Sequence, residues 1–183
     1  MSRLNHVDPA SAQGEAKKLF DQVQRQLGGV PNFMQVLGNS PPALAAFLGL
    51  NGNLSRGSLD PKTRERIALN TAEANGCEYC VSAHSALGEQ AGLSSSEIGA
   101  ARRGASEDLK AQAALEFAET VLERRGEVTT AELRAVREAG FDDAQIVEIL
   151  SHVALNVLTN FLGKVGQIDI DFPRVALLTK AAA

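Results

Sequence analysis

The chain has 183 residues, which is long enough for one domain with a substantial hydrophobic core. Hydrophobic residues make up 44 % and charged residues 22 %, with one tyrosine and no tryptophan, so Leu, Val, Ile and Ala must fill the interior, a composition that favours packed helices. The formal net charge of −4 offers no basic face for a phosphate backbone or an anionic lipid surface, so we expect neither nucleic acid nor a membrane as partner.

The N-terminal segment MSRLNHVDPASAQGEAKKLF has no uninterrupted apolar run after its first basic residue, so it lacks the pattern of a signal peptide. We find no apolar stretch of the roughly 18 to 20 residues that a membrane-spanning helix needs. We therefore expect a cytoplasmic protein. Because a permanent disulfide is disfavoured in a reducing compartment, a chemical role is favoured for the two cysteines over a structural one.

Helix start and stop signals follow one another along the chain, and the first is Asp8 followed by Pro9. Ser94 and Thr129 each precede a glutamate by three residues, which is the spacing of a capping box, and Ser106 resembles a further cap. In the N-terminal part, the signals delimit helical segments at 8–27, 31–37 and 41–54. In the part that follows, they delimit helices at 61–74, 77–91, 94–103, 106–125, 129–139 and 142–166.

Only the short segment IDIDF, residues 168–172, alternates in the manner of a strand. No Pro-rich or Ser-rich linker, charge block or tandem repeat divides the chain. The sequence therefore predicts an all-α fold, a helical bundle that forms a single domain over residues 1–183. We expect N-terminal helices over residues 1–57 and a core with the cysteine motif over residues 58–183.

The segment NGCEYCVSAH holds both cysteines of the chain, Cys77 and Cys80. If a helix begins at about Cys77, then Cys77 lies at or beside the N-cap and Cys80 lies in the first turn, where unpaired backbone N–H groups and the helix dipole favour a thiolate. His84 lies four residues beyond Cys80, on the same helix face and one turn further along. Cys80 is therefore expected to have a base within reach.

Glu65 is expected to meet His84 across a helical hairpin. Glu65 lies roughly 15 Å before the turn at Asn75 and Gly76, and His84 lies roughly 12 Å after it, at about 1.5 Å per residue. If the two helices are antiparallel, Glu65 can hydrogen-bond one nitrogen of His84 and orient the other toward Cys80, which is the arrangement of nucleophile, base and orienting group in thiol catalysis. Tyr79, between the cysteines, could donate a hydrogen bond at the same helix start.

Each of these residues also has a structural alternative. The cysteines could bind zinc with His84 as third ligand, but zinc sites usually take four ligands, and only His6 and His152 remain as nitrogen donors. The cysteines could also be inert, and Tyr79 could merely pack at the helix start. Glu65 could be a solvated charge on its helix, paired with one of its neighbours Lys62, Arg64 and Arg66.

The segment VEILSHVALNVLTNFLGKV has apolar residues on nearly every face of the last predicted helix, more than one packed side of a small bundle would cover. We therefore expect part of this helix to contact another subunit of a homo-oligomer. His152, Asn156 and Asn160 form a polar ladder on the same helix, and we expect them to hydrogen-bond within that contact.

The segment RERIALNTAEANGCEYCVSAH resembles the signature of the carboxymuconolactone decarboxylase and AhpD-like superfamily, in particular its alkylhydroperoxidase branch. That branch carries a glutamate, then Cys-x-x-Cys, then a histidine four residues after the second cysteine, and Glu65 stands at the usual spacing. The segments GGVPNFMQVLGNSPPALAAFLGLNGNL and GFDDAQIVEILSHVALNVLTNFLGKV are similar to the flanks of members described as peroxidase-related. The resemblance covers most of the chain.

The resemblance implies an AhpD-like helical bundle and a peroxidase that reduces hydrogen peroxide or organic hydroperoxides without metal or flavin. It implies that Cys80 is the peroxidatic cysteine, that Cys77 is the resolving cysteine, and that Glu65 and His84 form a proton relay. It also implies a lipoyl-bearing or thioredoxin-like dithiol reductant and assembly into trimers or hexamers. Tyr79 departs from the AhpD pattern, which has a histidine between the cysteines. A phenol, with a pKa of about 10, cannot replace that histidine as a base near neutral pH.

Three other functions stay open from the sequence. A general disulfide oxidoreductase or redox sensor would use the same cysteine pair and would react with disulfide substrates as fast as with peroxide. A zinc-bound helical protein would retain metal on purification. Lactone decarboxylation on a shared fold would survive the loss of both cysteines, and the decarboxylase branch lacks the cysteine pair, so its activity is not expected here.

Overall fold

The structure is a computed structural model that describes residues 2–178. Across those residues it is all-helical and contains no strand, which confirms the predicted all-α class. The helices of the described part are α1 (Gly14–Leu27), α2 (Asn32–Leu37), α3 (Pro41–Leu54), α4 (Pro61–Ala74), α5 (Glu78–Gln90), α6 (Ser95–Ala101), α7 (Leu109–Glu123), α8 (Thr130–Glu138) and α9 (Asp143–Gly166).

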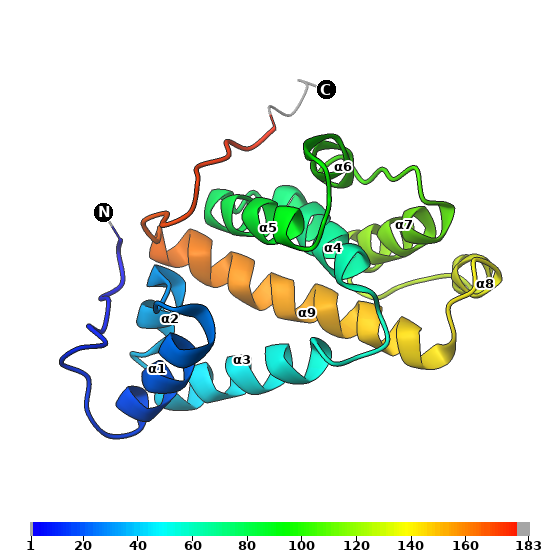
Figure 1. The fold of residues 1–183 in the computed structure, drawn as a ribbon. Helices are drawn as coiled ribbons and strands as arrows, with labels where there is room; N and C mark the ends of the chain where they lie inside the picture. Colours follow the sequence, from blue (N-terminus) through cyan, green and yellow to red (C-terminus); the bar gives the residue numbers. More distant parts are fainter. Residues whose placement is uncertain (1, 179–183) are drawn as a thin grey trace.

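The long helix α9 runs through the middle of the molecule and has other helices on both sides (Figure 1). On one side α4 and α5 form a hairpin that packs against it, and on the other side lies α3, which carries α1 and α2. Helices α6 and α7 pack on α4, and α8 packs on α7. This arrangement brings the turn between α4 and α5 against the C-terminal half of α9.

Local capping signals place most of these helices where the sequence predicts them. Asp60 caps α4, with its side chain accepting the backbone N–H of Thr63 at 3.0 Å. The two predicted capping boxes, which begin at Ser94 and Thr129, are both present. A third capping box begins at Asp142, ahead of α9. Because each cap satisfies N–H groups that the first helical turn leaves unpaired, these short motifs fix the helix starts.

Two predicted helix starts are wrong. Asp8 accepts the N–H of Ala10 at 2.9 Å, but this bond closes only a turn, and α1 begins at Gly14. Gly14 has a φ of 60°, so the backbone changes direction between that turn and the helix. Ser106 does not cap α7 either, since Asp108 accepts the N–H groups of Lys110 and Ala111 and occupies the N-cap position.

The segment after α9 is an extended strap across α5 and not the strand that the alternation of IDIDF suggests. The backbone N–H of Val175 donates to Ser82 Oγ at 3.0 Å, and the N–H of Leu178 donates to Glu73 Oε1 at 2.7 Å. These contacts hold the strap on the α4–α5 hairpin, and in Figure 1 it continues from the C-terminal end of α9 past α5.

One described helix, α9, is long and apolar enough to cross a membrane by length and composition alone, contrary to the expectation from the sequence. It has 24 residues and a mean hydropathy of 1.4 over the tested window, but half of that window is buried inside the chain. A core helix passes the same test, and α9 packs on α3, α4, α5 and α7. This property is therefore weak evidence for a membrane span.

Candidate functional site

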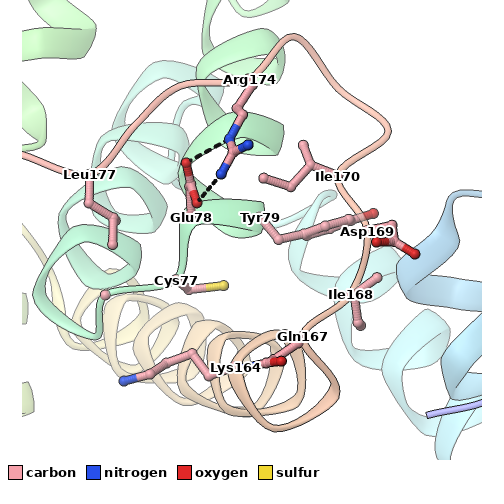
Figure 2. Close-up of a pocket in the computed structure, with 12 residues that line it drawn as sticks. Cys77, Glu78, Tyr79, Lys164, Gln167, Ile168, Asp169, Ile170, Arg174 and Leu177 are labelled. Carbon is pink, nitrogen blue, oxygen red and sulfur yellow. Dashed lines mark hydrogen bonds and ion pairs between the residues drawn. The ribbon is translucent and has the colours of Figure 1, made fainter. Parts of the chain in front are cut away.

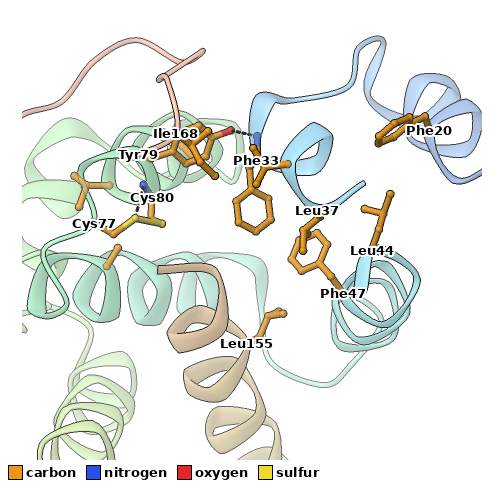
Figure 3. Close-up of a cluster of buried hydrophobic side chains, with 14 of the residues drawn as sticks. Phe20, Phe33, Leu37, Leu44, Phe47, Cys77, Tyr79, Cys80, Leu155 and Ile168 are labelled. Carbon is orange, nitrogen blue, oxygen red and sulfur yellow. Dashed lines mark hydrogen bonds between the residues drawn. A yellow bond between two sulfur atoms is a disulfide. The ribbon is translucent and has the colours of Figure 1, made fainter. Parts of the chain in front are cut away.

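The two cysteines lie at the start of α5, where they are joined by a disulfide. Cys77 is the N-cap residue of α5, as predicted, and its Sγ accepts the backbone N–H of Cys80 at 3.3 Å. Cys77 is 1 % exposed and Cys80 is 3 % exposed. Both belong to a hydrophobic cluster that includes Phe33, and Figure 3 shows the sulfur atoms next to its aromatic side chains. The pair is therefore shielded from bulk water and accessible to small reactants at most.

Helix α9 approaches the disulfide closely because residue 163 is a glycine. A Cβ atom at Gly163 would lie 2.9 Å from Cys77 Sγ and 3.6 Å from Cys80 Sγ. The first distance is shorter than real Cβ contacts allow, so only a glycine permits this packing. Gly163 is a site residue that sequence analysis missed, since nothing local to it indicates which side chains it meets.

We expect Gly163→Ala to make the disulfide easier to reduce. Overpacking costs about 1–3 kcal/mol, and this cost falls mainly on the oxidised state, because the disulfide fixes both sulfur atoms while a free thiol at Cys77 can rotate away. The reduction potential should therefore become less negative by roughly 20–60 mV. Equilibration in dithiothreitol redox buffers measures it.

The control for this variant is Gly49→Ala, because Gly49 lies on helix α3 and an added Cβ there would meet nothing within 4 Å. It should leave the potential unchanged. Equal potentials for Gly163→Ala and the unmodified protein would mean that α9 yields without strain, and that Gly163 has no influence on the disulfide.

Glu65 and His84 meet across the α4–α5 hairpin, as the helix register predicts. His84 Nδ1 donates a hydrogen bond to Glu65 Oε2 at 2.8 Å, and both side chains are 21 % exposed. The alternative in which Glu65 pairs with a basic neighbour is wrong. Arg66 pairs with Glu97 instead, and Arg64 donates to backbone carbonyls at the end of α3.

The second half of the predicted relay, from His84 to Cys80, is not present as a hydrogen bond within residues 2–178. In the disulfide state neither sulfur carries a proton that His84 could accept. The hydrogen bond to Glu65 uses Nδ1, which leaves Nε2 as the nitrogen available to a thiol. The role of His84 as a base for Cys80 stays a prediction about the reduced protein.

Tyr79 fastens neighbouring segments to the start of α5. Its hydroxyl donates to Asp171 on the strap at 2.9 Å and accepts the backbone N–H of Phe33 at 3.3 Å. Its ring lies edge-on to Phe172, with 5.8 Å between the centroids. Burial, followed by the adjacent Asp171 carboxylate, raises the pKa of the phenol well above its ordinary value. Tyr79 therefore stays protonated, and its hydroxyl is engaged away from the sulfur atoms.

The polar ladder on α9 faces the interior of its own chain. His152, Asn156 and Asn160 are all buried, and Asn160 accepts a hydrogen bond from Asn75 at 2.9 Å. Asn156 donates to the backbone carbonyl of His152 at 2.8 Å. The expectation that these three residues lie in a contact between subunits is therefore wrong, because the helical repeat turns them away from the exposed face of α9.

His152 lies within electrostatic reach of the Glu65–His84 pair. Its Nε2 is buried and has no hydrogen-bond partner among the described residues. Burial is the main cause that lowers the pKa of His152, the charge of Arg64 adds to this, and Glu148 and Glu65 oppose it. His152 is therefore favoured in its neutral form next to the candidate relay.

A cavity of about 690 Å³ opens beside the disulfide, and we call it the Cys77 cavity. It is lined by Cys77 and not by Cys80, and Figure 2 shows the sulfur of Cys77 directed into it. Its walls come from the turn before α5, the end of α9 and the strap: Gly76, Cys77, Glu78, Tyr79, Gly163, Lys164, Gln167, Ile168, Asp169, Ile170, Arg174 and Leu177. Of the predicted site residues, it takes in Cys77 and Tyr79.

Within residues 2–178, no group of three or more His, Cys, Asp and Glu side chains is arranged to hold a metal ion. The zinc alternative therefore has no donor set in the described part of the chain. The two sulfur atoms form a disulfide with each other, and His84 is hydrogen-bonded to Glu65.

Several solved structures share this fold over almost the whole chain. An alkylhydroperoxidase AhpD core, an uncharacterised peroxidase-related protein from Ralstonia eutropha JMP134, is 28 % identical, with a TM-score of 0.81 over 93 % of this chain and 92 % of that one. An uncharacterised peroxidase-related protein from Silicibacter sp. TM1040 is 24 % identical, with a TM-score of 0.79 over 92 % and 94 %. The apo form of a debrominase is 20 % identical, with a TM-score of 0.77 over 92 % of each chain. The last two likenesses show the fold alone.

The profile of the Carboxymuconolactone decarboxylase family matches residues 41–123, from the start of α3 to the end of α7. This stretch contains Glu65, both cysteines and His84. No curated protein matches the chain. The profile match and the shared fold support the resemblance seen in the sequence: residues 41–123 match the Carboxymuconolactone decarboxylase family model, and an AhpD-like helical fold extends over nearly the whole chain.

Proposed function

We propose that this protein is a thiol peroxidase that reduces hydrogen peroxide or organic hydroperoxides through a Cys77/Cys80 dithiol–disulfide cycle. The observation that carries the proposal is a disulfide at the start of α5, one turn before a histidine that a glutamate holds at 2.8 Å. The start of a helix favours thiolates, and a histidine fixed by a carboxylate is the usual activator of a nucleophilic cysteine.

In the proposed reaction, His84 accepts the proton of the Cys80 thiol, and Glu65 supports the imidazolium that forms. The Cys80 thiolate attacks one peroxide oxygen, the O–O bond breaks, and the leaving oxygen takes a proton from His84. The products are a sulfenic acid on Cys80 and an alcohol, or water if the substrate is hydrogen peroxide. The Cys77 thiol then loses its proton, and its thiolate attacks Cys80 Sγ and forms the disulfide. The hydroxide that leaves Cys80 takes up that proton and is released as water, and an external dithiol then reduces the disulfide.

The protein's own residues account for the oxidative steps of this cycle and the external dithiol for the reductive step, so the proposed cycle uses neither metal nor flavin. Tyr79 serves in it as a positioning residue, because its hydroxyl ties the strap and α2 to the helix start that carries the cysteines. The reductant that we propose is a dithiol, either lipoyl-bearing or thioredoxin-like, and we propose a cytoplasmic location, where such dithiols are available.

Steady-state turnover tests the proposal against its main rival, a general disulfide oxidoreductase. With dithiothreitol as electron donor, the protein should consume cumene hydroperoxide, and Cys77→Ser and Cys80→Ser should each abolish catalytic turnover. A disulfide substrate such as oxidised glutathione should react much more slowly than the hydroperoxide with the reduced protein. Faster reaction with the disulfide would favour the oxidoreductase, and consumption that survives the loss of both cysteines would exclude the cycle.

We also propose that the protein is a homo-oligomer, a trimer or hexamer, assembled through the exposed face of α9. Val147, Leu158, Phe161 and Val165 are 51–64 % exposed, and the last three follow one another at the three- and four-residue spacing of a coiled-coil seam. Such a row of large apolar side chains is typical of a contact surface.

Phe161→Glu places a charge in the middle of this row and should shift the mass in solution toward the 19.3 kDa monomer. Light scattering at micromolar concentration measures it. Leu109→Glu is the matched control, because Leu109 is 84 % exposed and lies outside α9, so the mass should not change. If the unmodified protein already has a mass near 19.3 kDa, the assembly proposal is wrong.

A further inference from the structure

The Cys77 cavity exposes one side of the disulfide and not the other. Cys77 is among its lining residues and Cys80 is not, although both residues belong to the same hydrophobic cluster. A thiolate that reduces a disulfide must approach in line with the S–S bond, from the side opposite the leaving sulfur. From this cavity that approach leads to Cys77 Sγ, with Cys80 as the leaving group.

The size and depth of the site restrict what can reach the sulfur. The cavity has a volume of about 690 Å³, which is in the range of small-molecule pockets. The Cys77 residue is only 1 % exposed, so the sulfur lies at the inner end of the cavity. A thiol on a small molecule or on a slender flexible arm can extend to that depth, whereas a cysteine on the surface of a globular partner cannot. Of the two kinds of reductant proposed above, the depth of the site therefore disfavours the thioredoxin-like protein.

The charges around the cavity favour an anionic reductant. Glu78 and Arg174 neutralise each other in an ion pair at 2.9 Å, and Asp169 accepts hydrogen bonds from Ser2. Lys164 has no carboxylate partner in residues 2–178, and its Nζ donates only to the backbone carbonyl of Asn75, at 2.6 Å. Lys164 and the N-terminus of α5 therefore leave positive potential on the side of the cavity nearest to Cys77.

We propose that the Cys77 cavity binds the reductant, a slender thiol carrying negative charge, and that its thiolate attacks Cys77 Sγ. The inference rests on the proposed peroxidase function and specifies its reductive half. The new bond joins the reductant sulfur to Cys77, the S–S bond to Cys80 breaks, and its electron pair leaves as the Cys80 thiolate at the start of α5. A second reductant thiol then attacks the reductant sulfur of this mixed disulfide, so that Cys77 leaves as a thiolate and the reductant becomes a disulfide.

Three thiols with the same two-carbon skeleton test the charge preference: 2-mercaptoethanesulfonate, 2-mercaptoethanol and cysteamine. Rates of reduction of the oxidised protein are compared per concentration of thiolate. The anionic thiol should react about two- to fivefold faster than the cationic one at low ionic strength, and the difference should vanish in about 1 M salt, where the screening length is about 3 Å. Lys164→Gln should remove most of the preference. Lys18→Gln, an exposed lysine on α1, is the matched control and should keep it.

Acid quenching at early times followed by alkylation and fragment-ion mapping identifies the attacked sulfur. The probe should be found on Cys77 and the alkyl group on Cys80. Rates independent of thiol charge, a preference that Lys164→Gln leaves intact, or a probe on Cys80 would each overturn the proposal. Oxidation of the reduced wild-type protein by peroxide is measured separately. Fast oxidation combined with any of those results contradicts this inference alone, whereas slow oxidation contradicts the peroxidase function itself.

Discussion

Cys80→Ser should abolish the reaction of the protein with hydroperoxide, whereas Cys77→Ser should still be oxidised and should accumulate a sulfenic acid. Cys80 lies in the first turn of α5, one turn before His84, so it is the thiol that we expect to be activated. Without Cys77 the sulfenic acid has no partner with which to condense. Trapping with dimedone and peptide mapping should place the label on Cys80 in the Cys77→Ser protein.

Labelling of Cys77 in place of Cys80 would assign the peroxidatic role to the cysteine that lines the cavity beside the disulfide, because Cys77 and not Cys80 is among its lining residues. If dimedone labels Cys77 in the Cys80→Ser protein at the wild-type rate, the roles of the two cysteines are exchanged. In that case the cavity serves the hydroperoxide. The double variant Cys77→Ser/Cys80→Ser is the control for nonspecific labelling and should take up none.

His84→Ala should slow oxidation of Cys80 near pH 7 by at least about tenfold, because a positioned base contributes typically about 10²- to 10⁴-fold and water replaces it in part. Glu65→Gln should have an intermediate effect, since it keeps a hydrogen bond to His84 but removes the charge that supports an imidazolium. Stopped-flow measurement of peroxide-driven disulfide formation gives these rates. Glu89→Gln, an exposed carboxylate near the end of α5, is the matched control and should have no effect.

The pH dependence separates a proton relay from a structural support. The decreases in oxidation rate caused by His84→Ala and Glu65→Gln should become smaller as the pH rises from about 5.5 to 10. This range crosses the ordinary cysteine pKa of about 8.5, above which the Cys80 thiol ionises without a base. The variants should therefore approach the wild-type rate at the alkaline end. Parallel profiles, offset from wild type with an unchanged apparent pKa, would mean that Glu65 and His84 only support the hairpin.

The parts of the fold that the sequence predicts correctly depend on local chemistry. Ser94 and Thr129 cap helices because their side chains reach N–H groups three residues away, which a sequence pattern records directly. The contact between Glu65 and His84 was also predictable, because a tight turn between two helices fixes which levels lie side by side. These signals locate the centre of the candidate site.

The features that the sequence did not predict depend on contacts between elements and not on local chemistry. Ser106 and Asp108 are both residue types that favour the N-cap position, and the structure places Asp108 there. The bond between Tyr79 and Asp171 spans 92 positions, and the contact of Gly163 with Cys77 joins helices far apart in the sequence. Periodicity along one helix cannot predict such pairs, because they depend on how whole elements pack. Most of the residues that line the Cys77 cavity could therefore not be predicted from the sequence.

The most direct test of the peroxidase account is a single-turnover measurement on the reduced protein. It is mixed with hydrogen peroxide or with cumene hydroperoxide, and mass spectrometry follows the formation of the Cys77–Cys80 disulfide. The account predicts loss of both thiols at a rate proportional to peroxide concentration and at least about tenfold faster than a free thiol reacts at the same pH, as a positioned base requires. Disulfide formation no faster than the oxidation of a free thiol with either hydroperoxide would contradict it.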